Sequence, residues 1–282
     1  MNAELKRSLE IFAVKERLLL LEGIFNAKAG HPGGSLSIAE ILAYLYNVEM
    51  KADSSNPKDE NRDRFVLSKG HAAPALYATL ALKRYFPTED MKTLRKSDSY
   101  LQGHPSMKCV PGVDMSTGSL GQGISAAVGM ALAAKLDKKD YRVYTILGDG
   151  EIEEGQVWKA SMFAAAKKLD NLVVIVDNNN LQIDGTVEEV NSPYPIPEKF
   201  KAFGFNVIEI DGNCLDEIEK AFESAKTVKG KPTAIVAKTV KGKGVSYMEN
   251  AVNWHGAAPN EELYNTAVAE LTEKLKELEG AK

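Results

Sequence analysis

Two short polar segments, thirty residues apart, follow apolar runs and carry residue types that could hold a hard cation. Gly148-Asp149-Gly150 follows the run 142–147, and Asn178-Asn179-Asn180 follows the run 172–176. The small residues of 158–169 between them have helical character, so the pattern predicts a strand–helix–strand unit. A right-handed crossover makes such strands parallel and brings their carboxyl ends to one crevice. We therefore expect the two polar segments to converge.

The oxygen atoms available in these segments suit Mg²⁺. The carboxylate of Asp149, the amide oxygen of Asn179 and the backbone carbonyl of Leu181 fit an octahedral shell that phosphate oxygens would complete. Gly150 lets the backbone approach a phosphate closely, and the helix after it points N–H groups at the anion. Either motif alone is typical of an ordinary turn. Their spacing of one crossover favours a metal–phosphate site.

The four histidines of the chain all lie beside glycine. Their segments are Gly30-His31-Pro32, Gly70-His71, Gly103-His104-Pro105 and His255-Gly256. Any one of them alone is more typical of a surface or core residue, but a glycine beside every imidazole indicates loops where backbone and ligand approach closely. The joint pattern favours a binding site.

A third glycine-rich segment, Thr117 to Gly123, precedes a helical stretch of small residues over 124–136. A dinucleotide-binding loop is excluded because no convincing strand precedes the segment and no acidic residue follows at the required distance. Close helix packing explains the small residues of 124–136.

The Gly148-Asp149-Gly150 motif and Asn179 together resemble the signature of thiamine diphosphate enzymes, and Glu151 to Gln156 and Ile183-Asp184-Gly185 are similar to transketolases. The resemblance implies thiamine diphosphate and Mg²⁺ as cofactors, with Ca²⁺ or Mn²⁺ able to replace Mg²⁺. It assigns Asp149, Asn179 and the Leu181 carbonyl as metal ligands. The cofactor-binding residues that it implies are His71, Gly118, Leu120, Gly150, Asn179 and His255.

The resemblance also implies roles for the imidazoles, with His31, His104 and His255 as the catalytic set. It places His71 and His255 at the diphosphate, and His31 and His104 at the hydroxyls and carbonyl of a sugar. A protonated His255 would stabilise the charge that develops as a carbon–carbon bond breaks. Transketolases usually carry proline where this chain has Ser119, which makes the rigidity of that loop less certain.

The apolar and helical segments alternate, which predicts an α/β fold with a doubly wound, mostly parallel sheet and helices on both faces. We expect a single domain over 1–282, with its core at about 5–260 and an amphipathic helix at about 261–279 docked on it. Ser37 and Glu40 predict a capping box that opens a helix. The expected strands are 64–68, 142–147, 172–176, 205–210 and 233–237, and the other expected helices are 5–25, 124–136, 158–169 and 215–228.

Composition excludes several classes of protein. The net charge is −4 with both signs interspersed, so neither nucleic acid nor a membrane surface is an expected partner. Two isolated cysteines predict no disulfide framework and favour a reducing, cytoplasmic compartment. The basic loop Lys241 to Gly244 is more typical of solvated charges than of a lid over the cofactor.

The resemblance covers about residues 5–260 and only the N-terminal, diphosphate-binding domain of transketolase. In that family the other half binds the aminopyrimidine ring and supplies its glutamate, and no segment here is a candidate; Glu154 is expected to support structure or relay protons. The resemblance therefore implies the N-terminal subunit of a split transketolase in the pentose phosphate pathway. A C-terminal subunit with the pyrimidine-binding and C-terminal domains would complete a heterotetramer of two copies of each chain. The complex would move a two-carbon ketol unit from a ketose phosphate to an aldose phosphate.

Three alternatives remain open. A subunit of a 1-deoxy-D-xylulose-5-phosphate synthase would share the metal motif, although the His31 and His104 contexts look more like transketolase. A non-catalytic scaffold subunit would not need all four histidines. A Mg²⁺-dependent phosphoryl-transfer enzyme would need a nucleophile or a P-loop, and the sequence offers neither.

Overall fold

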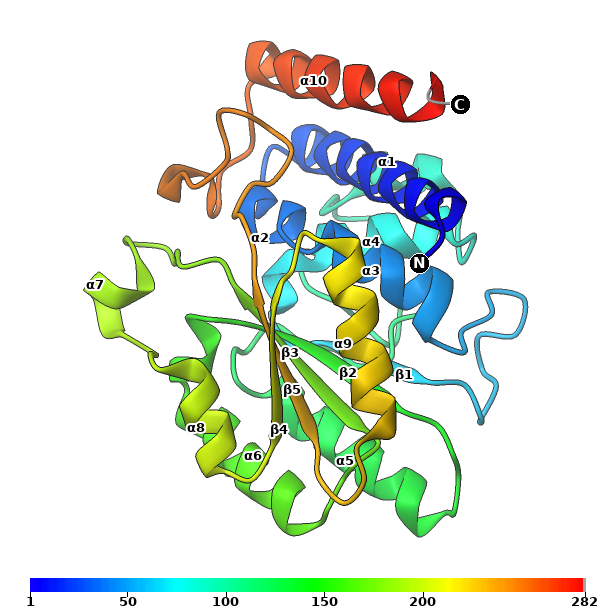
Figure 1. Ribbon diagram of the computed structural model, residues 1–282. Coiled ribbons are helices and arrows are strands. Elements are labelled where there is room, and N and C mark those ends of the chain that lie inside the picture. The colour runs from blue at the N-terminus through cyan, green and yellow to red at the C-terminus, as the bar shows by residue number, and fades with distance from the viewer. Residues whose placement is uncertain (281–282) are drawn as a thin grey trace.

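The computed structural model describes residues 1–280, and its centre is a five-stranded parallel sheet (Figure 1). The strands are β1 (Arg64–Leu67), β2 (Val143–Gly148), β3 (Leu172–Asn178), β4 (Asn206–Asp211) and β5 (Thr233–Lys238). Their order is β1-β2-β3-β5-β4, and every neighbouring pair is parallel. The predicted doubly wound parallel sheet is confirmed, with strand ends within two residues of those expected.

Both faces of β1, β2, β3 and β5 are buried, which is why these strands are mostly apolar, whereas the edge strand β4 is only partly buried and carries Glu209. Phe65, Tyr144 and Val173 are neighbours across three strands and belong to the core on one side. Val66 and Val174, one residue further along their strands, belong to the core on the other side. Alternation along each strand therefore feeds two separate hydrophobic cores.

One core lies between the sheet and the helices that are drawn below it in Figure 1. The helices that contribute to it are α5 (Gly123–Leu136), α6 (Gly155–Ala166) and α8 (Ile196–Ala202). Ala127 and Ala131 of α5 are fully buried, and their small side chains allow α5 to lie close to the strands and to α6. The close-packing interpretation of this segment is confirmed.

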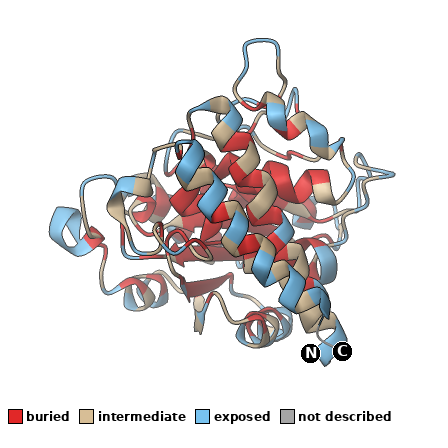
Figure 2. Cartoon of the chain, turned by 90° about the horizontal axis from the view of Figure 1, so that it is seen from above, coloured by how far each residue is buried: buried red, intermediate tan, exposed pale blue. Residues whose placement is uncertain are grey.

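The other core is covered by helices from both ends of the chain. Its largest element is α1 (Ala3–Ala27), and α10 (Glu261–Gly280) runs antiparallel to it: Phe25 stacks on Tyr264, and the Arg7 guanidinium donates to the carbonyl of Glu279 at 2.6 Å. Figure 2 shows the buried residues concentrated beneath this largely exposed C-terminal helix. The predicted docking of the tail is confirmed. The remaining helices are α2 (Pro32–Leu36), α3 (Ala39–Tyr44), α4 (Ala73–Leu82), α7 (Val187–Asn191) and α9 (Leu215–Thr227).

Short 3₁₀ and π-helical segments connect the longer elements. Four are 3₁₀ turns and one is a π-helical turn: Gly70–Ala72, Thr88–Thr93, Glu151–Glu153, Val252–Trp254 and Leu45–Glu49. Within residues 1–280, no helix has both the length and the apolar character that crossing a membrane requires.

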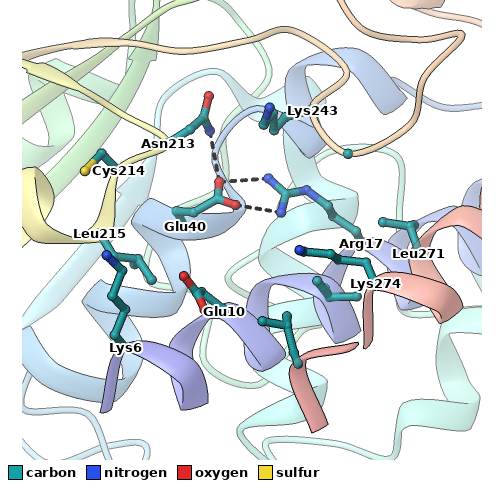
Figure 3. A pocket seen from close by; sticks show the side chains of 13 residues that line it. Lys6, Glu10, Arg17, Glu40, Asn213, Cys214, Leu215, Lys243, Leu271 and Lys274 are labelled. Atoms are coloured by element: carbon teal, nitrogen blue, oxygen red, sulfur yellow. Dashed lines mark hydrogen bonds and ion pairs between the residues drawn. The ribbon is translucent and has the colours of Figure 1, made fainter. Parts of the chain in front are cut away.

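The predicted capping box at Ser37 is wrong. The helix begins at Ala39, and no side chain caps it. Glu40 is instead held by the guanidinium of Arg17 at 2.7 and 2.8 Å and by Asn213 Nδ2 at 2.9 Å (Figure 3). Residues distant in the sequence therefore bind the Glu40 side chain that the capping box would have used.

Candidate functional site

All ten predicted site residues line one cavity of about 230 Å³. The cavity lies at the carboxyl ends of the central strands, where open α/β sheets bind ligands. The structure thus brings together segments from the whole length of the chain, although the roles of the individual residues stay predictions. The ten are His31, His71, His104, Gly118, Leu120, Asp149, Gly150, Asn179, Leu181 and His255.

The expected metal ligands follow neighbouring strands. Asp149 comes directly after β2 and Asn179 directly after β3. Asp149 Oδ1 accepts from the Gly150 amide at 2.9 Å, and its Oδ2 accepts from the Asn180 amide at 2.5 Å. Asn179 Oδ1 accepts from the Leu181 amide at 3.2 Å. The bond between Asn180 and Asp149 joins the two strand ends, which converge as the sequence predicted.

The chemistry of this set fits a hard divalent cation. Burial and the nearby Asp177 carboxylate raise the pKa of Asp149 to about 7, so its ionised form needs a positive partner. Carboxylate, amide and carbonyl oxygens are the ligands that Mg²⁺ prefers. Among residues 1–280 no three His, Cys, Asp or Glu side chains form a metal cluster, so any metal here depends on Asn179 and Leu181 as well.

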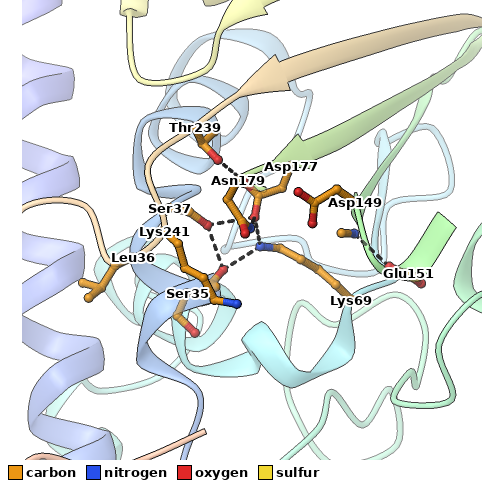
Figure 4. Close-up of polar contacts among 12 residues, drawn as sticks. Ser35, Leu36, Ser37, Lys69, Asp149, Glu151, Asp177, Asn179, Thr239 and Lys241 are labelled. Carbon is orange, nitrogen blue, oxygen red and sulfur yellow. Dashed lines mark hydrogen bonds and ion pairs between the residues drawn. The ribbon is translucent and has the colours of Figure 1, made fainter. Parts of the chain in front are cut away.

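Sequence reasoning missed a buried ion pair beside these ligands. Lys69 Nζ lies 2.6 Å from Asp177 Oδ2 and also donates to the Gly34 carbonyl at 2.6 Å (Figure 4). Both charged side chains are almost completely inaccessible to solvent. A carboxylate inside an otherwise apolar strand was the available signal, because a buried charge requires a partner.

Glu151 is a second buried acid whose role the sequence did not reveal. Its carboxylate accepts from Ser68 Oγ at 2.5 Å, from the Gly121 amide at 2.9 Å and from the Gly148 amide at 3.0 Å. Three segments around the cavity are therefore joined through one side chain. Glu154, by contrast, is exposed at the start of α6.

Lys241 is buried, which corrects the interpretation of the basic loop as solvated. Its Nζ lies 2.8 Å from the Leu181 carbonyl and 2.9 Å from His255 Nδ1. Burial lowers the pKa of Lys241 to about 8, so the ammonium still carries its charge at neutral pH. Lys243 behaves as the sequence suggested, because it is partly exposed and pairs with Glu249 at 3.3 Å.

Three histidines form a compact cluster in the cavity. The ring centres of His31 and His71 are 5.3 Å apart, as are those of His71 and His255, and His31 lies 5.6 Å from His255. Burial lowers the pKa of His31 to about 4 and that of His71 well below its ordinary value. These imidazoles are neutral at pH 7 and each offers one donor and one acceptor.

His255 is neutral as well. Burial and then the Lys241 ammonium lower its pKa to about 3. An ammonium can only donate, so Nδ1 of His255 accepts and the ring proton is on Nε2. Lys241 therefore fixes the tautomer and presents an N–H donor on the other side of the ring.

His104 is held in position by backbone contacts. Tyr77 Oη donates to the His104 carbonyl at 2.8 Å. Gly118 has φ +143°, and a Cβ there would lie 3.0 Å from the His104 ring. A side chain at 118 would thus displace the imidazole, which explains the glycine.

A larger cavity of about 570 Å³ lies between α1, the start of α9 and α10 (Figure 3). Charged side chains from several elements line it, including Lys6, Arg17 and Lys274, but none of the ten predicted site residues does. The chemistry predicted from the sequence is therefore concentrated in the smaller cavity.

Comparisons with known proteins show the family of this chain. The family described as "Transketolase, thiamine diphosphate binding domain" matches residues 10–275. The 6-deoxy-6-sulfo-D-fructose transketolase subunit SqwG of Clostridium sp. is 51% identical over 90% of this chain and 93% of that protein. One subunit of the apulose-4-phosphate transketolase of Phocaeicola vulgatus is 45% identical over 96% of this chain and 96% of its own length.

Single-chain transketolases are much longer. The crystal structure of transketolase from Campylobacter jejuni superposes with a TM-score of 0.89 and 37% identity, over 96% of this chain but only 43% of that one. Human transketolase is 43% identical over 82% of this chain and 37% of its own length. The chain belongs to the transketolase family and corresponds to its thiamine diphosphate-binding domain.

Proposed function

We propose that this chain is the diphosphate-binding subunit of a two-subunit transketolase with the activity of EC 2.2.1.1. The observation that carries the proposal is the gathering of all four histidines and the three expected metal ligands in one cavity. A scaffold that only bound a partner would not need this set. A subunit of 1-deoxy-D-xylulose-5-phosphate synthase remains the weaker enzymatic alternative.

The coverage of the relatives and the rim of the cavity support a second subunit. The chain spans less than half of single-chain transketolases but nearly all of two relatives that are named as subunits. Leu120 and Ile183 line the cavity and are 38% and 67% exposed. A partner that covers these apolar side chains would close the site and exclude water. We propose a heterotetramer with two copies of each subunit.

The residues of this chain would hold the cofactor and orient the sugar. Asp149, Asn179 and the Leu181 carbonyl would hold Mg²⁺, and His71 with the N–H donor of His255 would meet the diphosphate. His31 and His104 would hydrogen-bond the sugar hydroxyls and carbonyl. When bound, thiamine diphosphate supplies the electron sink for ketol transfer.

The substrate class that we propose is a ketose that carries a terminal anion. The two subunit relatives are named for a sulfonated ketose and for a sugar phosphate. We propose a ketose phosphate as donor and an aldose phosphate as acceptor in the cytoplasm, where two free cysteines stay reduced.

Reconstitution tests this function. The chain is purified from its native host under mild conditions, and mass spectrometry identifies the protein that accompanies it. Ketol transfer is then assayed with fructose 6-phosphate, and with 6-deoxy-6-sulfofructose, for the chain, the partner and the mixture. We expect turnover only in the mixture and only with thiamine diphosphate and Mg²⁺. Turnover by the chain alone, or none by the purified complex with either donor, contradicts the proposal.

A further inference from the structure

Asp177 is a buried charge whose role the proposed function does not explain. Its carboxylate, at the end of β3, accepts from Lys69 Nζ at 2.6 Å, Ser37 Oγ at 2.8 Å, Asn179 Nδ2 at 2.8 Å and Thr239 Oγ1 (Figure 4). The ammonium of Lys69, buried beside it, balances its negative charge, and every one of these contacts is with a donor. The group is therefore an ionised carboxylate that can only accept.

The bond from Asn179 fixes the direction of its amide group. Nδ2 can donate to Asp177, whereas the opposite orientation would place the amide oxygen against a buried carboxylate oxygen. Oδ1 is left on the other side of the amide, where it accepts from the Leu181 amide. This is the oxygen that the proposed metal site requires.

We propose that Asp177 is a positioning residue, neutralised by Lys69, that turns the amide of Asn179 so that its oxygen faces the cation. The inference depends on the metal site of the proposed function. Lys69 contributes in two ways. Its ammonium balances the charge of Asp177, and it binds the Oδ2 of Asp177, which could otherwise bind the metal ion.

Moving the carboxylate from residue 177 to residue 179 separates this role from a merely structural one. Asp177→Leu has a side chain of similar size but no acceptor for Asn179, so nothing holds the Asn179 amide in one orientation. In the double variant Asp177→Leu/Asn179→Asp the total charge is that of the native chain, and residue 179 offers oxygen in either orientation. A structural role predicts no rescue by the second substitution.

The experiment measures Mn²⁺ binding by electron paramagnetic resonance, on the full chain and on its complex with the co-purified partner, in the presence of thiamine diphosphate. We expect Asp177→Leu to weaken Mn²⁺ binding by about 10- to 100-fold, and the double variant to bind within about threefold of the native chain or more tightly. Ser37→Ala is the matched control, because it removes another hydrogen bond to Asp177 and leaves the acceptor of Asn179 in place. We expect Ser37→Ala to bind Mn²⁺ like the native chain.

A second readout needs no metal. The side-chain NH₂ of Asn179 should exchange slowly with solvent in a ¹⁵N spectrum of the native chain and more rapidly in Asp177→Leu. Native Mn²⁺ affinity in folded Asp177→Leu, a double variant as weak as the single one, or an unprotected native NH₂ overturns the inference.

The two readouts also separate this inference from the proposed function. Failure of the native chain and its complex to take up Mn²⁺ refutes the metal site of the proposed function, and the Asn179 resonance then decides the orientation alone. If Asp177→Leu does not fold, the comparison is made in a Lys69→Met background, which removes the stranded ammonium.

Discussion

Glu16 provides a test of the electrostatics of the α1 core. Its carboxyl group is fully buried, and neither oxygen has a hydrogen-bond partner within the described chain. Thr79 of α4 faces this carboxyl group. The positive charge of Arg17 lowers the pKa of Glu16, and the negative charge of Glu40 raises it. Burial raises the pKa of Glu16 well above the ordinary value of 4.5. The folded chain therefore keeps a proton that the unfolded chain releases.

The size of the effect follows from this difference of one proton. Between pH 4.5 and the folded-state pKa, the free energy of unfolding falls by about 1.4 kcal/mol for each pH unit. The loss of stability therefore accumulates with pH for as long as the carboxyl group of the folded chain stays protonated. Glu16→Gln keeps the shape of the side chain and cannot ionise. We therefore expect its free energy of unfolding, relative to that of the native chain, to increase by about 1.4 kcal/mol for each pH unit in this range.

Urea unfolding at several values between about pH 5 and pH 8 measures the difference. Glu10→Gln is the matched control, because Glu10 lies on the same helix with its side chain only half-buried. We expect a difference that grows with pH for Glu16→Gln and one that stays nearly constant for Glu10→Gln. Parallel curves for Glu16→Gln and the native chain would refute the argument from burial.

Three further predictions concern the cavity. Asp149→Ala should abolish Mg²⁺-dependent binding of thiamine diphosphate in the reconstituted complex, as measured by calorimetry; normal binding would remove Asp149 from the metal site. His104→Ala should raise KM for the sugar by roughly 10-fold, because a hydrogen bond of about 1–2 kcal/mol is lost, and leave cofactor affinity unchanged; a selective loss of cofactor binding would contradict its assignment to the sugar. Gly242→Ala should destabilise the loop that carries Lys241 by about 1–2 kcal/mol or more, since the residue has φ +78° and a Cβ would lie 2.2 Å from the Met248 carbonyl oxygen. Faster hydrogen exchange at 240–250 would confirm the last prediction, and unchanged protection would contradict it.

The parts of the site that follow strand ends could be predicted from the sequence. Asp149 and Asn179 each come after an apolar run, and the rule that parallel strands end at one edge was enough to bring them together. The histidines could be singled out because glycine lies beside each of them. Local sequence was sufficient wherever one rule of chain geometry determined the position.

The parts that depend on distant partners could not be predicted. Lys69 and Asp177 are 108 residues apart, and no local pattern indicates that they pair. Ser37 is predicted to cap a helix, but its hydroxyl donates to Asp177 and so joins the buried network instead. In both cases tertiary contacts with a buried charge outweigh the local preference.

Because the strands are parallel, they all begin at one end of the sheet, and a probe can be attached there. The strands begin on the side opposite the cavity, where Lys229 and Lys231 are exposed in the turn before β5. The six residues of β5 span about 20 Å, so a dye on this turn stays clear of the cofactor cavity. Energy transfer from such a dye to a labelled second subunit would follow assembly in real time while the chemistry proceeds undisturbed.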